Sequence, residues 1–135
     1  MSEVEITYLL SGTDGTKLFF ETFGTLYEEN DVKILNFIEE TEDTIRTKVI
    51  IHQNYIELLR SGIITMYVPF INTKETTMVI STAFGYKIEI LTKTIKLAIN
   101  DNNIYVKYQT EMDKEKNIVH TLDLKWKNKK YNDLQ

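Results

Sequence analysis

One arginine holds an inward-facing position in the sequence pattern. Alternation along the strand expected at Tyr55–Arg60 places Arg60 on the same face as Ile56 and Leu58. A buried guanidinium is costly unless it is paired, so Arg60 either is satisfied by a nearby carboxylate and backbone carbonyls or meets the acid group of a ligand. The more common outcome is structural, with Arg60 closing one end of the fold beside Gly62 or turned outward by a bulge.

Two further polar side chains share the apolar faces of later segments. His120 is in phase with Leu122, and Tyr108 is in phase with Val106. A histidine there could donate a proton or contact a ligand, although a neutral core histidine with one hydrogen bond is the more common reading. No second histidine or carboxylate cluster completes a set, so no catalytic residue, metal ligand or cofactor is assigned. The candidate ligand-binding residues are therefore Arg60, Tyr108 and His120.

Three other clusters have simpler explanations. Four carboxylates between two expected strands are interpreted as a charged hairpin tip and not as an acid–base or cation site: Glu39, Glu40, Glu42 and Asp43. The segment Ser11–Lys17 resembles a phosphate loop but lacks its glycine spacing and following helix, so it indicates a hairpin. The lysines at residues 125–130 are interpreted as a solvated end to the last strand and not as a nucleic-acid surface.

Composition restricts the class of protein that carries these residues. The 135 residues suit one domain, and 42% hydrophobic against 27% charged residues is typical of a soluble globular chain. The chain contains no cysteine, which removes disulfides and thiolate chemistry and suits a reducing compartment. A net charge of -4 argues against nucleic acid as the general partner. Because no signal peptide or membrane-length apolar run occurs, we expect a cytoplasmic protein with no membrane contact.

The elements that must position the candidate residues are strands. Short runs rich in Ile, Val, Thr, Tyr and Phe alternate with charged residues and end in Asn, Asp, Gly or Lys clusters. Asp14-Gly15 is the clearest tight-turn dipeptide between them. We expect eleven strands: Val4–Ser11, Thr16–Glu28, Val32–Glu39, Thr44–His52, Tyr55–Arg60, Ile63–Ile71, Thr76–Ser81, Tyr86–Thr92, Thr94–Asn100, Ile104–Met112 and Ile118–Trp126.

Short connections decide between two all-β architectures. A two-sheet sandwich with Greek-key crossings needs some long connections between its sheets, whereas the unpatterned segments here are only a few residues long. The sequence therefore predicts an antiparallel up-and-down meander closed into a barrel. We expect one barrel domain at residues 1–126, followed by a short polar tail at residues 127–135.

An Arg60-Ser61-Gly62 step leads into one expected strand, and Thr82-Ala83-Phe84-Gly85 opens another. In these motifs the chain from Arg60 onward resembles a family of bacterial calycin-like barrels, the YwiB-like or DUF1934 proteins, which usually have proline at the position of Ala83. Further matching positions are Ile63, Met66, Phe70, Thr92, Tyr108 and the acidic strand end at Phe37, Glu39 and Glu40. The resemblance implies a lipocalin-like closed barrel in the bacterial cytoplasm, and it implies no reaction.

Three classes of function remain open. The leading hypothesis is a non-enzymatic barrel that holds a small apolar or amphipathic ligand, although a barrel of this size can be filled entirely by side chains. The alternative is a protein-interaction module, recruiting a partner or a second copy to form a homodimer through an exposed strand edge or an outer apolar face. Its candidate exposed residues are Tyr67, Pro69, Tyr105, Leu35 and Phe37. An enzyme is the least favoured class, because one histidine and one arginine do not make a catalytic set.

Overall fold

The computed structural model describes residues 1–40, 44–113 and 116–129, and it confirms the predicted fold class. The chain is a single all-β domain in which each strand pairs antiparallel with the next and β10 pairs with β1, which closes the barrel. The strands are β1 (Ser2–Gly12), β2 (Lys17–Glu29), β3 (Val32–Glu40), β4 (Thr44–Ile51), β5 (Tyr55–Ser61), β6 (Ile64–Ile71), β7 (Glu75–Thr82), β8 (Lys87–Ile99), β9 (Asn103–Asp113) and β10 (Lys116–Asn128).

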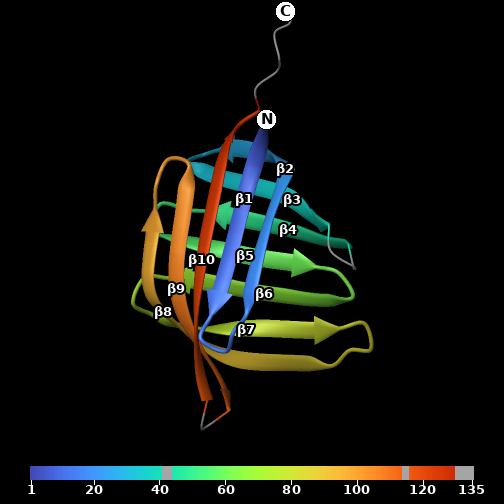
Figure 1. Cartoon of the computed structure of the whole chain (residues 1–135), viewed down its shortest axis with the longest axis vertical. Helices are drawn as coiled ribbons and strands as arrows, with labels where there is room; N and C mark the ends of the chain where they lie inside the picture. Colours follow the sequence, from blue (N-terminus) through green and yellow to red (C-terminus); the bar gives the residue numbers. More distant parts are fainter. Residues whose placement is uncertain (41–43, 114–115, 130–135) are drawn as a thin grey trace, which may run out of the picture.

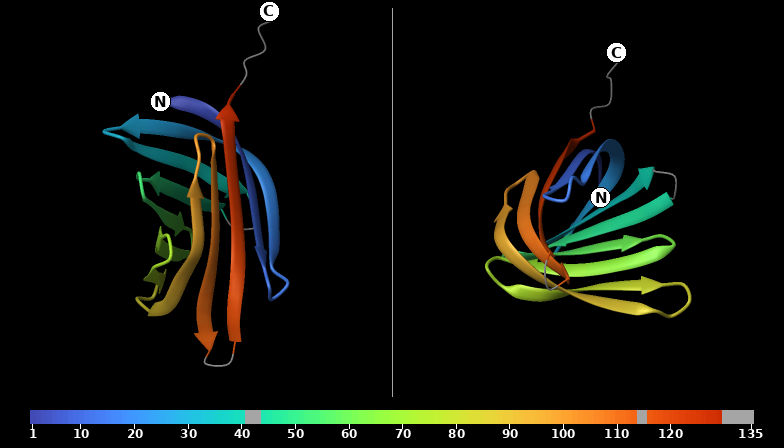
Figure 2. Two further views of the ribbon diagram at one scale, coloured as in Figure 1. Left: turned by 90° about the vertical axis from the view of Figure 1, so that its left-hand side faces the viewer. Right: turned by 60° about the horizontal axis from the view of Figure 1, so that its bottom comes forward.

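The closed sheet is flattened into two layers whose strands cross. Figure 1 shows β1, β9, β10 and the first half of β2 running nearly upright, in front of β3 to β7, which run across the molecule. Two strands pass from one layer to the other, because both β2 and β8 bend along their length (Figures 1 and 2). The bends form the corners of the barrel, and each corner has a local cause in the sequence.

Gly24 forms the corner in β2. A Cβ atom at this position would lie 2.3 Å from the carbonyl oxygen of Asn36 and 2.6 Å from Cδ1 of Ile6, which leaves room for hydrogen only. The ladder between β2 and β3 begins at Gly24, which pairs with Phe37, whereas the preceding part of β2 pairs with β1 alone. A glycine at a tight barrel corner lets the two backbones approach closely.

A β-bulge forms the corner in β8. The ladder between β8 and β9 shifts register between Thr94 and Lys96. Before the bulge the even-numbered side chains are buried, as at Thr92, whereas after it the odd-numbered Leu97 and Ile99 pack against the core. The prediction of two strands at Tyr86–Thr92 and Thr94–Asn100 was therefore wrong, since a bulge reverses the alternation without ending the strand.

The inward faces of both layers form one apolar core. Alternation correctly predicted the inward face of β9, where Ile104, Val106, Tyr108 and Thr110 are all buried. The phase chosen for β3 was wrong, because Leu35 and Phe37 are 0% and 4% exposed and belong to the core. The other proposed surface residues, Tyr67, Pro69 and Tyr105, are half-buried.

The last strand continues beyond its expected end at Trp126 and runs to Asn128. The N–H of Lys129 then donates a hydrogen bond of 3.0 Å to the carbonyl oxygen of Glu3. The described part of the chain contains no helix long and apolar enough to cross a membrane.

Candidate functional site

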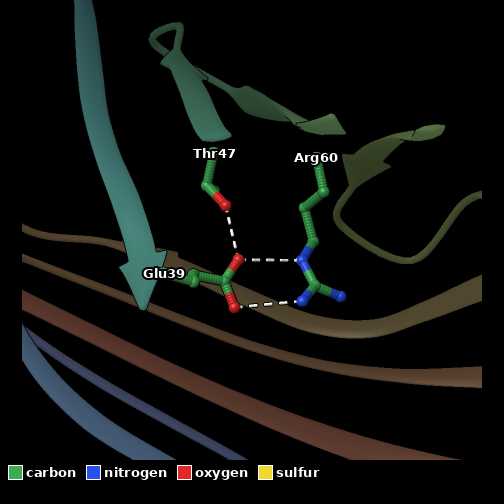
Figure 3. A network of polar contacts seen from close by, with 3 residues as sticks. All are labelled: Glu39, Thr47 and Arg60. Atoms are coloured by element: carbon green, nitrogen blue, oxygen red, sulfur yellow. Dashed lines mark hydrogen bonds and ion pairs between the residues drawn. The ribbon is translucent and has the colours of Figure 1, made fainter. Parts of the chain in front are cut away.

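A partly buried ion pair joins β3 to β5 on the inner face of the barrel. The guanidinium of Arg60 donates two hydrogen bonds to the carboxylate of Glu39, from Nε to Oε2 at 2.9 Å and from Nη2 to Oε1 at 3.0 Å. Thr47 on β4 adds a third hydrogen bond, from its Oγ1 to Oε2 of Glu39 at 2.5 Å (Figure 3). This parallel two-bond geometry is the strongest that arginine makes with a carboxylate.

Strand register brings these three side chains together. Thr47 pairs with Arg60 across the ladder between β4 and β5, so both side chains lie on the inner face. Glu39 reaches the same face because it is in phase with the buried Leu35 and Phe37. Of the two ways to satisfy an inward arginine that the sequence left open, the structure contains the protein carboxylate.

The interpretation of Glu39 as part of a charged hairpin tip was wrong. Its side chain is 0% exposed, because the phase of β3 directs it inward and Arg60 compensates its charge. The side chain of Glu40, together with Glu42 and Asp43, lies outside the described residues. The sequence did contain a signal for this position, because Glu39 shares the face of β3 that carries Leu35 and Phe37. The prediction that this face points outward hid it.

The positive charge of Arg60 affects the pKa of two buried tyrosines. Burial raises the pKa of Tyr108 to about 12, and the positive charge of Arg60 partly opposes this rise. Burial also raises the pKa of Tyr8, again against the effect of Arg60. Burial acts to lower the pKa of Arg60 itself, but the hydrogen bonds to Glu39 together with the charge interactions with Glu39 and the two tyrosines outweigh it, and the pKa is raised. Arg60 is therefore permanently charged and both phenols are neutral at ordinary pH.

The other two predicted site residues are in direct contact. The rings of Tyr108 and His120 stack with their centroids 4.8 Å apart, and Nε2 of His120 lies 3.1 Å from Oγ1 of Thr110. Burial lowers the pKa of His120, with a smaller opposing effect from Asp14. Nδ1 of His120 is buried and has no hydrogen-bond partner. These contacts favour the neutral imidazole, with its proton on Nε2 directed at Thr110.

Arg60 also reaches an open depression at one end of the barrel. The depression has a volume of about 290 Å³ and is lined by Ile45, Arg60, Gly62, Ile63, Ile64, Met66 and Ile80. The other residues that line it are apolar. The third nitrogen of the Arg60 guanidinium, Nη1, points away from Glu39 in Figure 3. Tyr108 and His120 are not among the residues that line it, so the three predicted residues divide between the depression and the neighbouring interior.

A larger groove of about 780 Å³ lies on the outer face of β2 to β5. Its exposed cations, Arg46 and Lys48, lie beside Ile38 and Asn36 on β3. The smaller depression is the better candidate site, because the ion-paired and partly buried Arg60 is among its lining residues, whereas the cations of the groove, Arg46 and Lys48, are exposed.

The sequence analysis did not identify a polar network formed by His52, Glu57 and Tyr67. Glu57 accepts a hydrogen bond of 2.6 Å from the hydroxyl of Tyr67 and lies 2.8 Å from Nε2 of His52, whose ring stacks on Tyr55. His52 is half-buried in these contacts. Within the described residues, no group of three or more His, Cys, Asp or Glu side chains gathers where it could hold a metal ion.

Comparisons with known proteins support the fold and leave the chemistry open. A family model described as "Domain of unknown function (DUF1934)" matches residues 4–124. The crystal structure of the ywiB protein from Bacillus subtilis is similar with a TM-score of 0.75 and 18% identity, covering 96% of this chain and 93% of that one. The attachment invasion locus protein Ail of Yersinia pestis reaches a TM-score of only 0.24 at 14% identity, over 93% and 96% of the two chains. No curated protein sequence matches significantly.

Proposed function

We propose that this chain, which belongs to the DUF1934 family whose description assigns no activity, binds a small amphipathic molecule in the depression beside Arg60. One observation carries the proposal. The guanidinium is held by Glu39 through Nε and Nη2 while Nη1 stays free of Glu39, and Arg60 lines a depression whose other lining residues are apolar. Binding sites of this kind combine an apolar surface with a few fixed polar groups.

The ion pair limits the chemistry of the polar group that binds. Glu39 neutralises most of the charge of Arg60, so the site offers directed N–H donors rather than a strong positive field. An uncharged acceptor such as an amide or hydroxyl oxygen suits Nη1 without disturbing the ion pair. Ile45, Ile64, Met66 and Ile80 then contact a short alkyl chain or ring.

The proposed setting follows the family resemblance. A calycin-like barrel in the bacterial cytoplasm would take such a molecule from solution and hold it without changing it covalently. We propose no reaction, because the ionisable groups around Arg60 are Glu39, which is paired with it, and two neutral tyrosines, one of which stacks on the neutral His120.

Amide NMR titration with octanamide, octanoate and octane tests the proposal. We expect octanamide to bind most tightly, with shifts concentrated at Ile63, Ile64 and Met66. Ile80→Trp fills the depression and should abolish these shifts, whereas Val79→Trp, on the opposite face of β7, should preserve them. Equal shifts in both tryptophan variants, or shifts spread evenly over the barrel, would disprove binding at this site.

A further inference from the structure

The first half of β2 has an unpaired edge. The N–H of Gly12 donates a hydrogen bond of 2.8 Å to the carbonyl oxygen of Thr16 in the β1–β2 hairpin. Because the direction of backbone N–H and C=O groups alternates along a strand, the even-numbered residues of β2 direct these groups toward β1. The odd-numbered residues turn theirs toward β3, whose ladder begins only at Gly24. Instead of a further ladder bond, Oγ1 of Thr22 donates to Ile38 O at 3.2 Å. Within the described residues, Lys17–Phe23 therefore lacks a strand partner on this side.

This edge lies at the margin of the molecule. In Figure 1 no strand of the front layer lies beyond the lower half of β2, and Figure 2 shows the end of the β1–β2 hairpin at the edge of the barrel. Phe19 is 56% exposed here, and the exposed Leu9 lies opposite it on β1. An exposed strand edge beside apolar side chains favours pairing with another strand.

The outer face of the edge carries a charge pattern that is complementary to itself. Lys17, Phe19 and Glu21 point outward in succession, and their partners on β1 are Ser11, Leu9 and Thr7, which leaves both charges without an opposite charge across the hairpin. If a second copy lies antiparallel with Phe19 on the twofold axis, each Lys17 faces a Glu21. The same register places Leu18 opposite Phe20 on the inner face. Shifting the axis to Glu21 places two glutamates opposite each other.

We propose that two copies of this chain pair through Lys17–Glu21 of β2, antiparallel and centred on Phe19, to form one continuous sheet. A second copy is favoured over an unrelated strand because charges, aromatic rings and inner-face apolar side chains match in a single register. The edge is separate from the Arg60 depression, whose lining includes none of these residues. Dimerisation and ligand binding are therefore independent proposals.

Cysteine cross-linking tests the register, since the chain contains no cysteine of its own. Opposite residues of a hydrogen-bonded antiparallel pair have Cα atoms about 5.5 Å apart, within the range of a disulfide. Phe19→Cys should therefore give a disulfide-linked dimer on mild oxidation. Glu21→Cys is the matched control, because in this register its two copies are roughly 13 Å apart. Linking through Glu21→Cys but not through Phe19→Cys would overturn the proposal.

Charge reversal tests the same pairing without cysteine. Glu21→Lys turns two attractive pairs into repulsive ones and should weaken the dimer roughly tenfold in sedimentation equilibrium. Lys17→Glu combined with Glu21→Lys restores opposite charges and should recover the affinity. Circular dichroism melting confirms that each variant is folded. A wild-type chain that sediments as a monomer at its highest soluble concentration, or a double variant no tighter than Glu21→Lys, would disprove the pairing.

Discussion

Arg60 and Glu39 meet as an ion pair whose partners differ in exposure, with side chains that are 23% and 0% exposed. The side chain of Glu39 is fully buried, and its carboxylate accepts hydrogen bonds from Arg60 and Thr47. The arginine keeps one side at the surface of the depression. The pair therefore has a structural role toward the core, and in the proposed function it presents Nη1 to a ligand.

Arg60→Met should destabilise the fold, because it leaves the carboxylate of Glu39 buried without its counter-charge. The expected loss in the free energy of unfolding is about 3 to 5 kcal/mol. The combined variant Glu39→Gln/Arg60→Met removes both charges and keeps an acceptor for Thr47, so it should recover much of that loss. Urea unfolding of the three proteins measures the difference. A double variant as unstable as Arg60→Met would contradict the importance of the unpaired charge.

Gly24→Ala should destabilise the barrel at its corner. The added Cβ meets a backbone oxygen at 2.3 Å, and backbone cannot move away as a flexible side chain can. We expect a loss of about 1 to 3 kcal/mol, which is typical of overpacking. Gly62→Ala is the control, since its Cβ would have ordinary contacts of 3.4 Å or more. Similar melting temperatures for the two variants would show that the corner can relax.

His120 should make stability depend on pH near neutrality. Because burial lowers its pKa in the folded state, the unfolded chain takes up this proton at a higher pH than the folded one does. The free energy of unfolding should therefore fall as the pH decreases through about 6.5, the ordinary value for histidine, and stop falling below the folded-state pKa. His120→Gln should lose this decline, whereas His52→Gln should keep it. An unchanged decline in His120→Gln would assign it to other groups.

Tyr67 should ionise at an unusually high pH for a half-exposed tyrosine. The hydrogen bond that its hydroxyl donates to the carboxylate of Glu57 favours the neutral phenol and raises the pKa of Tyr67 to about 12. The absorbance difference between wild type and Tyr67→Phe isolates this titration. In the Glu57→Gln background, the pKa of Tyr67 measured in this way should move toward the ordinary value of about 10. A midpoint near 10 in the wild type would show that the hydrogen bond is absent in solution.

Sequence pattern predicted the meander, the barrel and most inward faces, because alternation is clear wherever only one phase is apolar. The strand β3 is different, since Ile34 and Ile38 compete with Leu35 and Phe37, and only pairing with neighbouring strands decides which phase is buried. The wrong phase also hid Glu39, the partner that Arg60 required. A buried ion pair depends on two strands at once, so alternation within one strand identifies only half of it.

Alternation within single strands also predicted only part of the candidate site. Arg60 faces inward as expected, and Tyr108 contacts His120, which follows from their pairing across β9 and β10. The role of these residues in ligand binding stays a prediction. The depression depends on hairpin ends brought together by the closed sheet, as Ile45, Gly62 and Ile80 come from three different strands or turns. No local pattern encodes that arrangement.

The pairing of β1 with β10 makes barrel closure depend on residues from the two extremes of the described chain, such as Val4 and Asn128. Contacts so distant in sequence form only after a large loss of chain entropy, which makes closure slow compared with the formation of each hairpin. During synthesis on the ribosome, the edge of β1 that pairs with β10 would stay unpaired until β10 emerged. The time between the synthesis of β1 and that of β10 is thus the period in which this protein is most exposed to aggregation.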